Sequence, residues 1–204
     1  MTAIRSFRPG DELAIAEVCL RTADAGADAA GILSDDDLWA AVFALPYVAL
    51  HPDFAFVAED DSAVVRGYVV AAPDTAGFDA WFRDRWWPRF HERWPLPARA
   101  DRTREAGILR DAWRRGTEPV TTEEAQVAAA YPAHLHIDLL PELQGRGIGR
   151  RLIDTVLDRL REASVPGVQL GVDPRNTSAQ AFYTRLGFAP LPAPPGAFSY
   201  GRTL

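Results

Sequence analysis

The sequence predicts an α/β (α+β) fold in which residues 1–204 form a single domain around a mixed sheet. Three observations support this prediction. The C-terminal third alternates apolar strand-like runs with amphipathic helical runs. Residues 54–72 contain two strand-like runs joined by an acidic turn, which is typical of a β-hairpin. Between these regions, residues 75–130 are rich in tryptophan and arginine and are broken by prolines, which indicates a helical insertion, or cap.

The N-terminal region is expected to begin with a short strand over residues 4–7 and an amphipathic helix over residues 11–20. Residues 34–45 are expected to form a second helix. It stops there because the residue before a proline avoids the helical conformation, and Pro46 follows. The hairpin of residues 54–72 comes next.

The remaining elements are expected in a regular order. They are two cap helices (78–93 and 102–114), a strand (134–140), a helix (147–163), a strand (168–172), a helix (178–186) and a final hairpin (188–204). A strand, a helix and a further strand in succession imply two parallel neighbours joined by a right-handed crossover.

Composition excludes several classes of function. A net charge of −6 and a pI near 5.2 disfavour a nucleic-acid binder, which needs a basic face. No apolar run is long enough to span a membrane. The one cysteine, Cys19, is expected to be a buried structural thiol and fits a reducing cytoplasm. All basic residues are arginine, which together with abundant alanine suggests a bacterial genome rich in GC.

The most informative segment is a glycine turn, Gln144-Gly145-Arg146-Gly147-Ile148-Gly149, between a strand and a helix. Such a turn leaves several backbone N–H groups aimed at one point, where the helix dipole favours an anion. A P-loop is excluded because the chain has no lysine. A dinucleotide fingerprint is disfavoured because Arg150 stands where the third glycine belongs, although Asp173 imitates its ribose-binding acid.

The turn matches the pattern Gln/Arg-x-x-Gly-x-Gly at every fixed position, and in this the chain resembles the GCN5-related N-acetyltransferase (GNAT) superfamily. The segment from Asn176 through Tyr183 to Phe188 is similar to the second motif of that superfamily. Residues 131–138 and 200–204, with the tryptophan-rich cap, also resemble the acetyltransferase-like C-terminal domain of O-GlcNAcase. The likeness implies a free-standing bacterial relative that retains the phosphate turn.

The resemblance implies a GNAT fold, with a mostly antiparallel sheet, helices on both faces and acetyl-CoA as co-substrate. The strand ending at Leu139-Leu140 is expected to bulge and to splay from its parallel neighbour, so that its backbone binds the pantetheine arm. A backbone N–H near Leu139 or Leu140 is expected to bind the thioester oxygen. The pyrophosphate is assigned to Gln144, Gly145, Arg146, Gly147, Ile148, Gly149 and Arg150.

Two side chains in the second motif have alternative explanations. Asn176 is expected to bind the pantetheine, or to be a plain N-cap. Tyr183 is expected to protonate the departing thiolate, since a tyrosine is protonated at neutral pH, or to be structural.

The catalytic base is the most open assignment. Strand alternation places His134, His136 and Asp138 on one face. A buried aspartate is costly without a purpose or partner, so Asp138 is the first candidate, with a structural carboxylate that caps a neighbouring turn as the alternative. The resemblance makes His134 the second candidate, because it lies where some histone-acetylating members of the superfamily carry a glutamate. Two histidines beside an aspartate also suggest a metal site, but no further ligands are visible, so no metal is expected.

Together these features predict an N-acetyltransferase that moves acetyl from acetyl-CoA to an unknown amine, either a small molecule or a protein lysine. The cap either packs as a structural layer or also lines the acceptor pocket. The alternative function is an inactive acyl-CoA-binding or protein-interaction relative. No nucleic-acid or membrane partner is expected, and the chain is expected to be a cytoplasmic monomer or homodimer.

Overall fold

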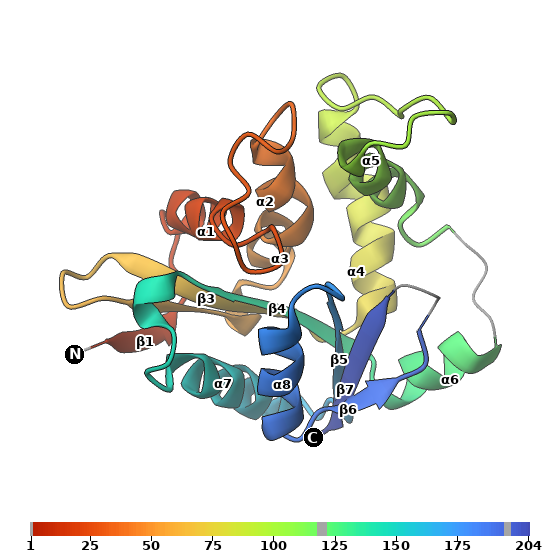
Figure 1. The fold of residues 1–204 in the computed structure, drawn as a ribbon. Coiled ribbons are helices and arrows are strands. Elements are labelled where there is room, and N and C mark those ends of the chain that lie inside the picture. Colours follow the sequence, from red (N-terminus) through yellow and green to blue (C-terminus); the bar gives the residue numbers. More distant parts are fainter. Residues whose placement is uncertain (1, 118–121, 194–196) are drawn as a thin grey trace.

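The computed structural model describes residues 2–117, 122–193 and 197–204, which are built around a seven-stranded sheet (Figure 1). The strands are β1 (Ala3–Ser6), β2 (Ala55–Glu59), β3 (Val65–Ala72), β4 (Ala133–Leu139), β5 (Gly167–Val172), β6 (Ala189–Leu191) and β7 (Phe198–Thr203). Their order is β1-β2-β3-β4-β5-β7-β6. Only β4 and β5 run parallel, so the predicted mixed, mostly antiparallel sheet is confirmed.

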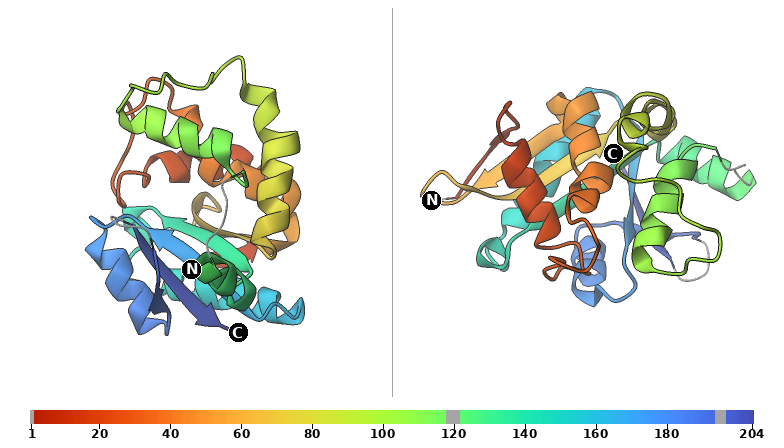
Figure 2. Two further views of the ribbon diagram at one scale, coloured as in Figure 1. Left: turned by 90° about the vertical axis from the view of Figure 1, so that its right-hand side faces the viewer. Right: turned by 90° about the horizontal axis from the view of Figure 1, so that it is seen from above.

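Helices cover both faces of the sheet, as predicted. One core lies between the sheet and α7 (Ile148–Glu162), whose apolar stripe of 3.6-residue period is fully buried, with α8 (Thr177–Arg185) at its side. The other core includes α1 (Glu12–Leu20), α2 (Asp37–Phe43), α3 (Leu45–Leu50) and the cap. Figure 2 (left) shows the yellow and green cap helices on the same side of the sheet as the red and orange ones.

The predicted single helix over residues 34–45 is wrong in extent. The chain bends at Ala44, and α3 begins directly afterwards with Pro46 in its first turn. Proline is tolerated at that position because the first helical N–H groups have no partner in any helix. Pro46 therefore starts a helix here instead of only ending one.

The cap also differs in detail from its prediction. Its first helix, α4 (Thr75–Trp81), continues as a π-helical turn over Phe82–Trp86 and a 3₁₀ turn over Trp87–Phe90. The second, α5 (Arg104–Arg114), lies close to where it was expected, and α6 (Thr122–Ala130) was not expected. The aromatic side chains pack into the α1–α3 core, where the indole N–H of Trp86 donates to the Ala41 carbonyl at 2.8 Å.

The parallel pair β4–β5 opens soon after it starts. Only Ala133↔Val168 and His134↔Gln169 are paired, although β4 continues to Leu139. The predicted splay is therefore present. The predicted bulge is wrong, because β4 stays in unbroken register with β3 from His134 to Leu139. Divergence of the two strands alone opens the gap.

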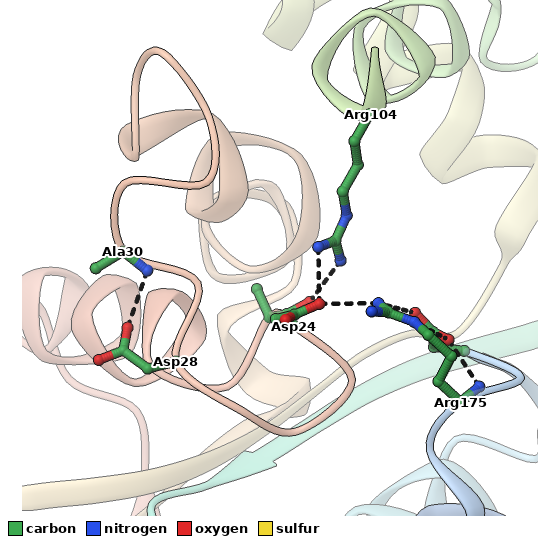
Figure 3. Close-up of polar contacts among 7 residues, drawn as sticks. Asp24, Asp28, Ala30, Arg104 and Arg175 are labelled. Atoms are coloured by element: carbon green, nitrogen blue, oxygen red, sulfur yellow. Dashed lines mark hydrogen bonds and ion pairs between the residues drawn. The ribbon is translucent and has the colours of Figure 1, made fainter. Parts of the chain in front are cut away.

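A loop over residues 21–31, named here the Asp24 loop, connects three parts of the fold (Figure 3). The Asp24 carboxylate accepts hydrogen bonds from Arg104 of α5 and from Arg175, just before α8, both at 2.8 Å. Backbone hydrogen bonds of 3.0 and 2.9 Å between Asp24 and Ala27 stiffen the loop itself. One carboxylate thus joins the cap to the segment that leads into α8.

Replacing Asp24 by Asn keeps the shape of the side chain but removes the charge that strengthens both bonds. We expect hydrogen–deuterium exchange to become faster in two places, the Asp24 loop and the first turn of α5. The matched control is Asp28→Asn, since among the described residues that carboxylate bonds only Arg21 and the Ala30 amide, inside the same loop. It should affect the loop alone, and unchanged exchange at α5 in Asp24→Asn would show that Asp24 does not hold the cap.

Candidate functional site

A cleft of about 570 Å³ lies where β4 and β5 separate, between the Asp24 loop, α7 and α8. Nine of the predicted site residues line it: Asp138, Leu139, Gln144, Gly145, Gly147, Gly149, Arg150, Asn176 and Tyr183. The other four, His134, Leu140, Arg146 and Ile148, do not. A second hollow of about 590 Å³, lined by Arg93, Trp94 and Leu96 of the cap among others, contains none of these residues.

The glycine turn has the backbone that its sequence requires. Gly145 and Gly147 have φ of +69° and +76°, and the side where a Cβ would lie is open at both. Helix α7 begins at Ile148. The first N–H that forms a helical hydrogen bond is that of Arg151, which donates to the Gly147 carbonyl. The N–H groups before it therefore lack helical partners at the positive end of the helix dipole.

Gly149 serves a different purpose from the other two glycines. A Cβ there would lie 3.2 Å from the Phe182 ring of α8, so the missing side chain lets α8 pack closely against the start of α7. The other two residues of the turn, Arg146 and Ile148, do not line the cleft. The Ile148 side chain is buried in the α7 core, and Arg146 is exposed and bonds the Glu142 carbonyl at 3.3 Å.

The end of β4 presents backbone groups to the cleft. The Leu140 N–H donates to the Arg66 carbonyl at 2.9 Å, so it is already used by β3. Successive backbone groups of a strand point to opposite edges, which directs the Leu139 N–H toward the gap beside β5. The Gln144 side chain donates to the Leu139 carbonyl at 2.8 Å and holds this end of the strand against the turn.

Asp138 is half-buried and lines the cleft. Its Oδ2 accepts a hydrogen bond of 2.5 Å from the hydroxyl of Tyr68, the residue paired with it on β3. Burial raises the pKa of Asp138 above that of an ordinary aspartate, and the hydrogen bond from Tyr68 partly opposes this. A carboxylate with a raised pKa is a stronger proton acceptor than an ordinary aspartate.

Tyr183 approaches the cleft from α8, with its ring packed against Phe182 and Phe188. Burial, and then the nearby charge of Asp138, raise the pKa of its hydroxyl. Among the described residues, none forms a hydrogen bond with that hydroxyl. The cleft is therefore lined by both a protonated hydroxyl and a carboxyl group.

His134 lies outside the cleft in a closed chain of hydrogen bonds. The Thr75 hydroxyl gives its single proton to the Pro132 carbonyl at 2.7 Å, so it must accept from His134 Nδ1 at 2.8 Å. His134 Nε2 then accepts from the Tyr47 hydroxyl at 2.7 Å. Burial lowers the pKa of His134 well below the ordinary value, and both ring nitrogens are in use.

Asn176 is the N-cap of α8 and also lines the cleft. Its Oδ1 caps α8 by accepting from the Ala179 N–H at 3.0 Å, while its amide nitrogen lies beside Gly26 of the Asp24 loop. A Cβ on Gly26 would lie 3.2 Å from that nitrogen, so the Asp24 loop runs directly over Asn176.

Sequence reasoning missed the Asp24 loop as a wall of the cleft, where Thr22, Ala25 and Gly26 lie. It also missed Tyr68. The only available signals were the loop glycines and a tyrosine inside an apolar strand, and neither specifies a partner.

Two features are absent from the part of the chain that the structure describes. No helix there is both long and apolar enough to cross a bilayer. In the same ranges, no three side chains of His, Cys, Asp or Glu are grouped closely enough to hold a metal ion.

Solved structures resemble the chain over its whole length. The crystal structure of a protein named SsHAT is 41% identical, with a TM-score of 0.90, and the match covers 99% of this chain and 98% of that one. The PaiA N-acetyltransferase of Thermoplasma acidophilum, crystallised with coenzyme A, shares the fold at 14% identity and a TM-score of 0.61, covering 100% and 99% of the two chains.

Curated relatives match over a shorter segment. A mycothiol acetyltransferase of Beutenbergia cavernae is 47% identical over 51 residues, which are 25% of this chain and 17% of that protein. The match thus spans about a sixth of that relative. The model of the acetyltransferase (GNAT) family matches residues 27–188. With most of its length matched, the chain belongs to the acetyltransferase (GNAT) family.

Proposed function

We propose that the protein transfers the acetyl group of acetyl-CoA to an amine by direct attack in a ternary complex. One observation carries the proposal: the glycine turn at the start of α7, the open edge of β4 and the pair Asp138–Tyr183 all line one cleft. The family and the coenzyme A complex of the PaiA relative support acetyl-CoA as the donor.

The cleft residues fit the parts of acetyl-CoA. Main-chain N–H groups from Gly147 to Arg150 suit the pyrophosphate, because no described group accepts a hydrogen bond from them and they lie at a helix N-terminus. The side-chain amide nitrogen of Asn176 and the exposed edge of β4 suit the amides of the pantetheine arm. When bound there, acetyl-CoA supplies an activated thioester carbonyl.

Groups of the chain itself then stabilise the developing charge and transfer the protons. As the amine nitrogen bonds the carbonyl carbon, the Leu139 N–H stabilises the negative charge on the carbonyl oxygen. Asp138 accepts the proton lost by the amine, and Tyr183 gives its proton to sulfur as the carbon–sulfur bond breaks. Return of a proton from Asp138 to Tyr183 through water restores both groups.

We assign the base to Asp138 rather than to His134 because of their surroundings. Asp138 lines the cleft together with Tyr183, whereas His134 has both nitrogens bonded and lies outside it. His134 would have to break a hydrogen bond before it could accept a proton.

Gly147→Ala tests the phosphate site. Because φ is +76° there and a Cβ would enter the open side of the turn, we expect acetyl-CoA affinity to fall about tenfold or more in a calorimetric titration. Gly10→Ala is the matched control, with a positive φ of +107° and equally open space, outside the residues that line the cleft. Equal affinity in both variants would argue against binding at the turn.

Asp138→Asn tests the base. Turnover would be screened with spermidine, glucosamine and a lysine peptide as acceptors. We expect kcat to fall about a hundredfold or more for any accepted amine, with acetyl-CoA affinity nearly unchanged. Asp53→Asn, an exposed change outside the cleft, should keep full activity. Loss of acetyl-CoA affinity in Asp138→Asn would show a structural role instead, and binding of acetyl-CoA without turnover of any acceptor would favour the inactive alternative.

A further inference from the structure

Tyr68 is a fully buried tyrosine in the middle of β3, on the face that carries Asp138. A hydroxyl is costly to bury unless it is hydrogen-bonded, and a phenylalanine would fill the same apolar space without that cost. The hydroxyl of Tyr68 donates to Asp138 Oδ2 at 2.5 Å, while the rest of the ring packs into the α1–α3 core. The hydroxyl thus lies against the Asp138 carboxylate, with the Cys19 thiol as a second polar neighbour.

Other groups near Asp138 do not replace this hydrogen bond. The hydroxyl of Thr22 is close enough to influence the carboxylate, but it directs its single proton to the Val18 carbonyl at 2.8 Å. Cys19 of α1 is buried beside Tyr68, and burial and the charge of Asp138 raise the pKa of its thiol, so it stays neutral.

The remaining titratable and charged groups around Asp138 come from three elements. On its own strand, burial lowers the pKa of His136 to about 4, so that ring is neutral at pH 7. Tyr183 faces it from α8, and Arg150 and Arg185 line the same cleft from α7 and α8. Among the described residues, the hydrogen bond to the Asp138 carboxylate that has a defined geometry is the one from Tyr68 to Oδ2, and Thr22 is the other hydroxyl that lowers the pKa of this group.

We propose that Tyr68 is a positioning residue for acetyl transfer: its hydroxyl holds Oδ2 of Asp138, fixes the carboxylate at the cleft and keeps it ionised to accept the amine proton. This role rests on the proposed function of Asp138 as the base. It differs from the role of Tyr183, since Tyr68 is fully buried and touches the reaction only through Asp138.

The direction of its effect on Asp138 follows from the charges. A hydrogen bond donated to a carboxylate stabilises the ionised form, so Tyr68 lowers the pKa that burial raises. Burial also raises the pKa of Tyr68 well above the ordinary value, so the donor keeps its proton. Removing the hydroxyl should therefore raise the pKa of Asp138. The expected rise is about one pH unit, because that is the size of the effect of one hydrogen bond to a charged group.

The test is a pH titration of the full chain labelled with ¹³C-aspartate, with the Asp138 carboxyl signal assigned from its absence in Asp138→Asn. In Tyr68→Phe we expect its midpoint to rise by about one pH unit. Tyr47→Phe is the matched control, because it removes an equally buried hydroxyl that bonds His134 instead. An unmoved or lowered midpoint in Tyr68→Phe would overturn the proposal.

A second measurement needs no Tyr68 variant, so it tests the proposal even if Tyr68→Phe folds poorly. In the unaltered chain, the buried hydroxyl proton of Tyr68 should resonate downfield in the proton spectrum and shift upfield in Asp138→Asn, where the acceptor is neutral. Absence of such a change contradicts the hydrogen bond itself.

Activity separates this proposal from the proposed function. If Asp138→Asn keeps full turnover, Asp138 is not the base, whatever Tyr68 does. Suppose instead that Asp138→Asn is inactive, and that Tyr68→Phe changes neither the midpoint of the Asp138 titration nor the low-pH side of the pH profile of kcat/KM. Only the proposed role of Tyr68 then fails.

Discussion

The early separation of β4 from β5 is the constraint on which the rest of the site depends. Parallel pairing ends after His134, so the second half of β4 keeps only β3 as a partner. The backbone N–H and C=O groups on that edge of β4 therefore face the gap. They would form hydrogen bonds with β5 if the two strands stayed paired. The β3–β4 register is unbroken along this edge, and Asp138 and Leu139 at its end line the cleft.

The two faces of β4 have different neighbours: one packs in the α7 core, and the other carries the polar side chains of the strand. Leu135 and its odd-numbered neighbours pack with α7, and so fix the strand relative to the glycine turn that begins that helix. The even-numbered face carries His134, His136 and Asp138 toward the α1–α3 side. Asp138 is the member of this row that reaches the cleft, and Tyr68 on β3 satisfies the oxygen that points into the protein.

Features encoded by local sequence were predictable. The glycine turn and the N-cap at Asn176 depend on residues within one turn of backbone, and the α7 stripe depends on helical period. Features that depend on distant partners were not. Tyr68 and Asp138 are 70 positions apart, and the register that pairs them is set by the whole sheet. The bend at Ala44 and the π-helical turn of the cap likewise had no local sequence signal that specified them. The single-domain organisation and the likeness to the O-GlcNAcase domain stay predictions.

The central claim is that the glycine turn and the open edge of β4 bind acetyl-CoA together. An amide-detected NMR titration of the chain with acetyl-CoA tests it most directly. The account predicts that the largest shifts occur at two separated places, the Leu139 amide and the amides of Gly147, Ile148 and Gly149. Saturation with shifts confined to other residues, or no shift in these segments at millimolar acetyl-CoA, would contradict it.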